Sequence, residues 1–138
     1  MNLPDSILID LAAGTAEGAL HVDPGAEYLQ DHFPGAPMLP GLLMLEVGVR
    51  VAAALWSATQ PPVGGAVLEH LERLQVVRRV LPGETLRVVA ARAGDGEVEP
   101  ARAWFAVRGT VGAEMAVRAK FRLRAIDAGH RQWEGQHA

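Results

Sequence analysis

The alternation of hydrophobic and polar positions is clearest near the end of the chain, in residues 114–124. Val117, Ala119, Phe121 and Leu123 alternate there with arginine and lysine. Successive side chains of a strand point to opposite faces of a sheet, so this pattern predicts a strand with one buried face and one solvated face. Such two-faced strands are typical of antiparallel sheets, and we therefore expect an antiparallel sheet.

Weaker strand patterns occur in five earlier segments, and turn residues separate them. The predicted strands cover residues 6–11, 16–22, 66–78, 85–93 and 101–108. The third of these is long enough to be bent. Turns are predicted where glycine recurs or lies beside proline or acidic residues, at 23–25, 81–84, 94–97 and 109–113.

A long apolar stretch separates the second strand from the third and predicts a helix from residue 40 or 41 to residue 56 or 58. Its only charged residues are Glu46 and Arg50. A helix that is apolar on nearly all sides is normally buried, so the antiparallel sheet is predicted to wrap around it in an α+β arrangement. We expect one domain over residues 1–125 and a C-terminal tail over residues 126–138.

Composition narrows the class of protein. A chain of 138 residues, 49% of them hydrophobic, fits one domain with a substantial core. Cysteine is absent, which excludes disulfides and thiolate metal sites. The N-terminus has no signal-peptide pattern, and the longest apolar run is short for a membrane span and carries two charges. We therefore expect a cytoplasmic protein that does not bind membranes. Because the net charge is -3, we also expect no binding of nucleic acid.

A rigid loop precedes the helix. Three prolines and two glycines fall within residues 34–41, which begin two residues after His32. Proline fixes φ and keeps the residue before it out of helical geometry, whereas glycine admits unusual backbone shapes. A stiff loop is useful where a polar side chain must be aimed, and His32 is the candidate.

Glu46 is a carboxylate within an otherwise apolar helix, and burying an unpaired carboxylate is costly. Three interpretations fit it. Glu46 forms an ion pair with Arg50, which lies one turn later on the same helix face. Alternatively, it is a catalytic acid that works with His32. In the third interpretation, the helix lies at a surface and exposes a polar stripe.

The segment from His32 to Glu46 reads His-Phe-Pro-Gly-Ala-Pro-Met-Leu-Pro-Gly-Leu-Leu-Met-Leu-Glu. It resembles the signature of the 3-hydroxyacyl-acyl carrier protein dehydratases, which are small hot-dog enzymes of bacterial fatty acid synthesis. A second block, residues 71–86, is similar to a family segment that ends in a turn with proline, glycine and an acidic residue. The resemblance covers residues 7–125. It implies the hot-dog fold, with the sheet wrapped around the central helix, and dehydration of 3-hydroxyacyl thioesters in fatty acid or related polyketide or polyene synthesis.

The resemblance also implies the roles of individual residues. Its catalytic histidine corresponds to His32, its catalytic acid to Glu46 and its carbonyl-binding glycine to Gly41. These roles suit the chemistry, because histidine titrates near neutrality, a buried carboxyl can hold a proton, and N–H groups at a helix start stabilise developing negative charge.

Further expectations concern binding. Phe33, Pro40 and Leu42 are implied to contact the substrate. No metal or organic cofactor is implied. The family forms homodimers, or oligomers of dimers, in which the histidine and the acid of one site come from different subunits. Acyl carrier protein is acidic, so Arg78 and Arg79 are candidates for its docking.

Arg50 departs from the family pattern, which often has glutamine at that position. An arginine one turn from Glu46 favours the charged carboxylate and would weaken it as an acid. Two other classes therefore stay open. One is a hot-dog thioesterase or enoyl-coenzyme A hydratase, and the other is a non-catalytic acyl-binding relative.

Overall fold

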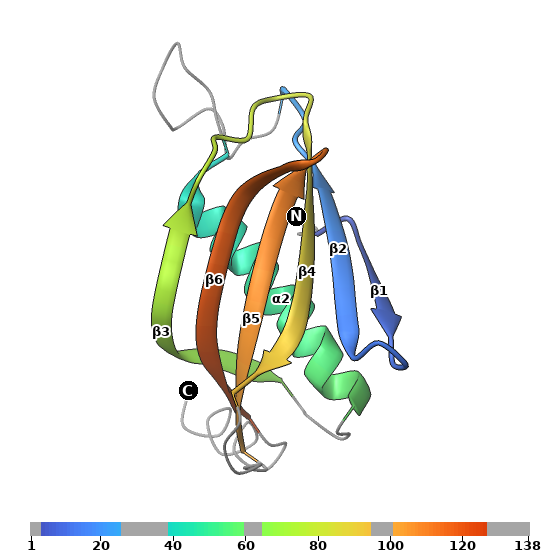
Figure 1. The fold of residues 1–138 in the computed structure, drawn as a ribbon, viewed down its shortest axis with the longest axis vertical. Helices are drawn as coiled ribbons and strands as arrows, with labels where there is room; N and C mark the ends of the chain where they lie inside the picture. The colour runs from blue at the N-terminus through green and yellow to red at the C-terminus, as the bar shows by residue number, and fades with distance from the viewer. Residues whose placement is uncertain (1–3, 26–38, 60–64, 95–100, 127–138) are drawn as a thin grey trace, which may run out of the picture.

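The computed structural model describes residues 4–25, 39–59, 65–94 and 101–126, which form one six-stranded antiparallel sheet and one helix, α2 (Figure 1). The elements are β1 Ser6–Asp10, β2 Thr15–His21, α2 Gly41–Thr59, β3 Ala66–Val76, β4 Thr85–Ala93, β5 Arg102–Val111 and β6 Glu114–Ala125. The predicted α+β class is confirmed, and so are the order and approximate positions of the elements.

The strands lie in the order β1-β2-β4-β5-β6-β3. The chain leaves β2 near one edge, crosses the sheet through α2 and returns as β3 at the opposite edge (Figure 1). The remaining strands then fill the middle of the sheet, each antiparallel to its neighbours. As a result, β3 is an edge strand that lies beside β6 and near the start of the helix.

The predicted turn at 109–113 is wrong in part, because β5 continues to Val111 and pairs with β6 up to the contact of Val111 with Glu114. A Cβ atom on Gly109 would lie 2.6 Å from a methyl carbon of Val117. Gly109 is therefore a close-packing glycine within a strand. The turn itself is tighter and uses Gly112, whose φ of 59° lies in the left-handed region that glycine adopts readily.

The strand predicted at 66–78 ends earlier, at Val76, and it is bent as expected. Its register against β6 shifts between Leu68 and His70 and again between Leu71 and Arg73. Each shift inserts one extra residue into β3, and such bulges kink a strand and increase its twist.

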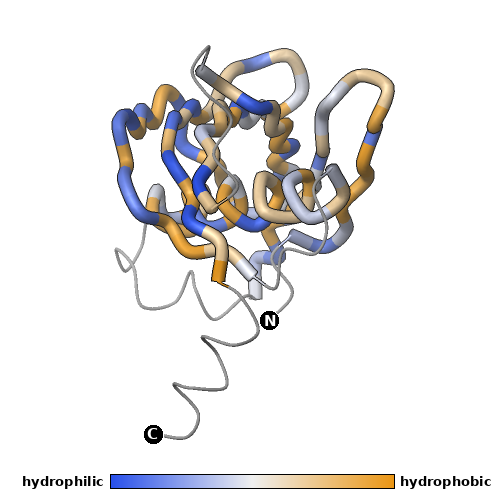
Figure 2. The backbone as a smooth tube through the Cα atoms, turned by 90° about the horizontal axis from the view of Figure 1, so that it is seen from below, coloured by the Kyte–Doolittle hydropathy of each residue, from blue (hydrophilic) through white to orange (hydrophobic). Residues whose placement is uncertain are grey.

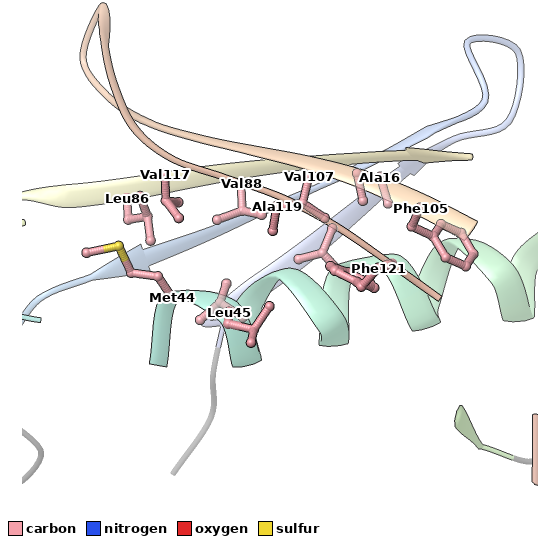
Figure 3. Close-up of a cluster of buried hydrophobic side chains, with 14 of the residues drawn as sticks. Ala16, Met44, Leu45, Leu86, Val88, Phe105, Val107, Val117, Ala119 and Phe121 are labelled. Atoms are coloured by element: carbon pink, nitrogen blue, oxygen red, sulfur yellow. The ribbon is translucent and has the colours of Figure 1, made fainter. Parts of the chain in front are cut away.

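The core lies between α2 and the sheet. Met44 of the helix points toward Leu86 of β4 and Val117 of β6 (Figure 3), and all three side chains are buried. Gly48 allows the helix to approach closely, since a Cβ atom there would lie 3.0 Å from a methyl carbon of Val107. Along the strands, hydrophobic and hydrophilic positions alternate, so that one sheet face is apolar and the other polar (Figure 2). The alternation predicted for 114–124 is confirmed in β6.

The helix is buried on one side only. Eight of its 19 residues are buried, whereas the side away from the sheet exposes Leu42, Glu46 and Arg50. By length and composition α2 could cross a membrane, although it is packed against the sheet as the core helix of a soluble protein is. The sequence led us to expect a helix buried on nearly all sides. In the structure, α2 is buried only on the side that faces the sheet.

Candidate active site

The first turn of α2 is built on Pro40. The Pro40 carbonyl accepts hydrogen bonds from the N–H groups of Leu43 and Met44, at 3.0 and 3.2 Å. The chain just before it is anchored, because the Leu39 N–H donates to the Val80 carbonyl at 2.9 Å. The first N–H groups of a helix have no partner within the helix, and they attract negative charge. Because Leu43 and Met44 already donate to Pro40, the N–H groups of Gly41 and Leu42 are the donors at this helix start that could face an oxyanion.

Gly41 lies at this start and is in close contact with the end of β3. A Cβ atom on Gly41 would be 3.2 Å from a methyl carbon of Val76. Glycine is therefore favoured here by packing, in addition to the close substrate approach expected from the sequence. The neighbouring surface is apolar, because the side chains of Leu42, Val76 and Val77 are all exposed.

Glu46 and Arg50 form an ion pair on the exposed side of α2, with 2.9 Å between Arg50 Nη2 and Glu46 Oε1. Their side chains are 43% and 50% exposed, respectively. The predicted i,i+4 pair is present, and the predicted exposed polar stripe is present with it. Within the described residues, Arg50 contacts one of the two carboxylate oxygens of Glu46, Oε1. The two structural interpretations of Glu46 are thus both present, and the catalytic one stays a prediction.

The other predicted site residues divide into two groups. Gly41, Leu42, Pro40 and Glu46 lie together in the first two turns of α2 or just before it. His32 and Phe33 lie outside the described residues, so the pairing of His32 with Glu46 stays a prediction. In the part of the chain that the structure describes, no group of three or more histidine or acidic residues could hold a metal ion.

Arg78, a predicted docking residue, is engaged within the fold. Its Nη1 and Nη2 atoms donate to both carboxylate oxygens of Glu84 at 2.9 and 2.7 Å, and its Nε donates to Glu114 at 2.8 Å. These hydrogen bonds of Arg78 with Glu84 and Glu114, called the clamp below, join the turn before β4 to the start of β6. Arg79 is exposed and stays the more accessible docking candidate.

The clamp shifts the pKa of both Arg78 and Glu84. The hydrogen bonds from Arg78 and from the Leu81 N–H lower the pKa of Glu84 to about 2. Hydrogen bonds to Glu84 and Glu114 raise the pKa of Arg78 above its ordinary value. Sequence reasoning identified the turn at 81–84 but missed the clamp. The only feature of the nearby sequence that could have indicated the clamp is the acidic residue Glu84, six residues after Arg78.

One helix packed on one face of a curved six-stranded antiparallel sheet is the arrangement of the hot-dog fold (Figure 1). The sequence agrees, because residues 9–118 match the family model described as ApeI-like, ApeI dehydratase. The chain belongs to the ApeI-like dehydratase family.

Two related proteins support the assignment to a dehydratase family. The chain is 30% identical over 115 residues to the 3-hydroxyacyl-[acyl-carrier-protein] dehydratase FabZ of Alkaliphilus metalliredigens, a match that covers 80% of this chain and 74% of the relative. It is 34% identical over 112 residues to the FabZ of Pelotomaculum thermopropionicum, covering 80% and 71%, respectively. The predicted membership of a dehydratase family is confirmed.

Solved structures share the fold. The dehydratase heterocomplex ApeI:P of Xenorhabdus doucetiae matches with a TM-score of 0.64 and 21% identity, covering 88% of this chain and 96% of that one. A putative thioesterase of Ralstonia eutropha, a phenylacetic acid degradation-related protein, matches with a TM-score of 0.68 and 19% identity, covering 87% and 83%. At these identities the likeness concerns the fold, and the predicted hot-dog fold is confirmed.

Proposed function

We propose that this protein removes water from 3-hydroxyacyl thioesters carried on acyl carrier protein and gives trans-2-enoyl thioesters in fatty acid, polyketide or polyene synthesis. The observation that carries the proposal is the placement of Glu46 five residues after Gly41 on the open side of α2. Five residues span about 7.5 Å of helix, and helical side chains lean toward the N-terminus. One acyl group can therefore meet both positions.

In the proposed reaction, the thioester carbonyl accepts hydrogen bonds from N–H groups at the start of α2. His32 takes a proton from C2, and the C3–O bond breaks as Glu46, or a water that it holds, gives a proton to the departing hydroxyl. The electrons of the C2–H bond form the C2=C3 double bond, and water leaves. The exposed apolar side chain of Leu42 lies beside this path and can contact the acyl chain.

A homodimer, or an oligomer of dimers, would complete the site. Among the described residues, the edge strand β3 has no partner on one side and exposes Leu68 and Leu71, and an open apolar edge favours pairing with another strand. Joining two sheets at β3 would bring the loop of one subunit toward the helix of the other. His32 would then reach the partner's Glu46, as the family pattern implies.

Acyl carrier protein is the proposed carrier and the cytoplasm the proposed location. Exposed Arg79 lies beside Val80, whose carbonyl is bonded to the chain just before α2, so a docked acidic carrier could deliver its thioester there. A thioesterase activity has no comparable support, because the putative thioesterase of Ralstonia eutropha shares only 19% identity with this chain.

The test is mass spectrometry of two substrates, 3-hydroxydecanoyl-acyl carrier protein and its coenzyme A ester. We expect loss of one water from the carrier-bound substrate, with a lower kcat/KM for the coenzyme A ester. The Arg79→Gln variant should raise KM for the carrier-bound substrate and leave the coenzyme A reaction unchanged. Release of the free acid in place of the enoyl product would instead identify a thioesterase.

A further inference from the structure

The outer face of the sheet, opposite α2, contains a groove with a volume of about 490 Å³. Small apolar side chains of β4 and β5 form its floor, and cationic side chains of β3, β5 and β6 line it: Ala91, Ala106, Arg73, Arg108, Arg118 and Lys120. We call this the outer groove. Among its lining residues none is acidic.

Strand register brings the groove residues together from four strands. Ala91 pairs with Ala106, Ala106 with Lys120, and Lys120 with Arg73, so these side chains form one row across β4, β5, β6 and β3. Arg108 pairs with Arg118 in the next row. Paired residues of neighbouring strands share a sheet face, which gives an apolar half and a cationic half to one hollow.

The outer groove contains two pairs of cationic residues on neighbouring strands, and each pair places like charges opposite each other. Arg108 faces Arg118, and Arg73 faces Lys120. Like charges directly opposite on neighbouring strands destabilise a sheet. The arrangement therefore carries an electrostatic cost that a bound anion would remove.

Internal partners relieve only part of this cost. Lys120 has Glu72 at 3.3 Å, and Arg118 donates to the neutral amide oxygen of Gln75 at 2.7 Å. Within the described residues, no carboxylate lies within 4 Å of the guanidinium groups of Arg73, Arg108 or Arg118.

A neighbouring cluster on the same strands shows how the fold neutralises cations where it has its own counterion. Arg102, Arg122 and Arg124 surround Glu69, with ion-pair distances of 3.1, 2.7 and 3.4 Å. The Glu69 side chain is only 18% exposed. Within the described residues, the outer groove has no equivalent of Glu69, so a bound anion could serve as its counterion.

We propose that the outer groove binds a small amphiphilic anion, with a carboxylate or phosphate head on an unbranched apolar chain. The head would lie between Arg108 and Arg118, because paired guanidinium groups suit the geometry of such oxyanions. The chain would lie over Ala91 and Ala106, and the volume is in the range of small-molecule sites. A second copy of this face would only add like charges. The site is separate from Glu46, which lies on α2.

The test follows the alanine methyl signals of Ala91 and Ala106 by NMR of the whole protein during titration with decanoate, decyl phosphate, decanol and inorganic phosphate. We expect saturable shifts of both methyls with the two amphiphilic anions, weaker binding at higher salt, and much weaker binding of decanol and of phosphate. The tighter of the two anions identifies the head group. Equal binding of decanol, or shifts confined to residues of α2, would overturn the proposal.

Variants test separately whether the cationic half of the outer groove binds the head group and the apolar half binds the chain. Arg108→Gln combined with Arg118→Gln should weaken the binding of both anions by at least about tenfold, since it removes the charge-assisted hydrogen bonds. Ala106→Phe should fill the exposed floor and weaken binding of the chain. Arg124→Gln is the matched control, because it removes an arginine of the same face that is paired with Glu69. Equal losses in the control and in the double variant would contradict the assignment.

Discussion

The Arg50 guanidinium contacts the Glu46 carboxylate at 2.9 Å, one turn away on the exposed side of α2. Such a charge-assisted hydrogen bond holds the carboxylate against Arg50. A carboxyl group that acts as a general acid must reach the departing hydroxyl, directly or through a water. The ion pair therefore competes with the acid role proposed for Glu46.

The Arg50→Gln variant should raise kcat for dehydration. Without the guanidinium, Glu46 is released from its ion pair and can turn to the departing hydroxyl. Arg87→Gln is the matched control, because Arg87 is an exposed arginine near Glu17 on the sheet. Equal kcat values for the wild type and Arg50→Gln would show that the ion pair does not restrain Glu46.

Mixing two inactive variants tests whether the site spans two subunits. His32→Ala and Glu46→Gln dimers should each be inactive, because each lacks one proton-transfer group. After co-refolding, half of the dimers are mixed and each holds one intact site, so about a quarter of the wild-type activity should return. If both groups belong to one chain, mixing restores nothing.

The Gly109→Ala variant should destabilise the protein by about 1–3 kcal/mol, measured by urea unfolding, since the new methyl group overpacks the core. Its Cβ would lie 2.6 Å from Val117 and 3.0 Å from Leu86. Adding Val117→Ala creates space, so the double variant should lose less stability than the sum of the two single changes. Strict additivity would argue against close packing at Gly109.

The clamp between Arg78 and Glu84 should make stability depend on pH in acid. The pKa of Glu84 is about 2 in the folded protein and 4.5 ordinarily, so its contribution is complete above about pH 4.5 and is lost as pH falls toward 2. Glu84→Gln should therefore lower stability at neutral pH and flatten the decline between pH 4.5 and 2. Glu17→Gln serves as a control, and an unchanged slope in Glu84→Gln would contradict the clamp.

The helix and the strands could be predicted from the sequence because each is indicated by a pattern among residues that are close together in the chain. Alternation in 114–124 identified β6, and the apolar run identified α2. Gly109 was assigned to a turn because glycine is typical of turns, whereas its real constraint is Val117, on the next strand. Close packing between strands leaves no local signal.

The same reasoning explains which parts of the site could be predicted. Arg50 was found because its partner Glu46 is four residues away. Arg73, Arg108 and Arg118 are far apart in sequence, and only the strand order β4-β5-β6-β3 brings them into one groove. Glu114 contacts Arg78 for the same reason, across 36 positions.

The most direct measurement is mass spectrometry of 3-hydroxydecanoyl-acyl carrier protein incubated with the wild type and with His32→Ala. The wild type should convert it to the trans-2-enoyl thioester until hydration equilibrium is reached. His32→Ala should stay folded and dimeric but react about 10²- to 10⁴-fold more slowly, because it lacks the general base. An unchanged rate in His32→Ala, or no enoyl product from the wild type at any acyl length, would contradict the proposed function.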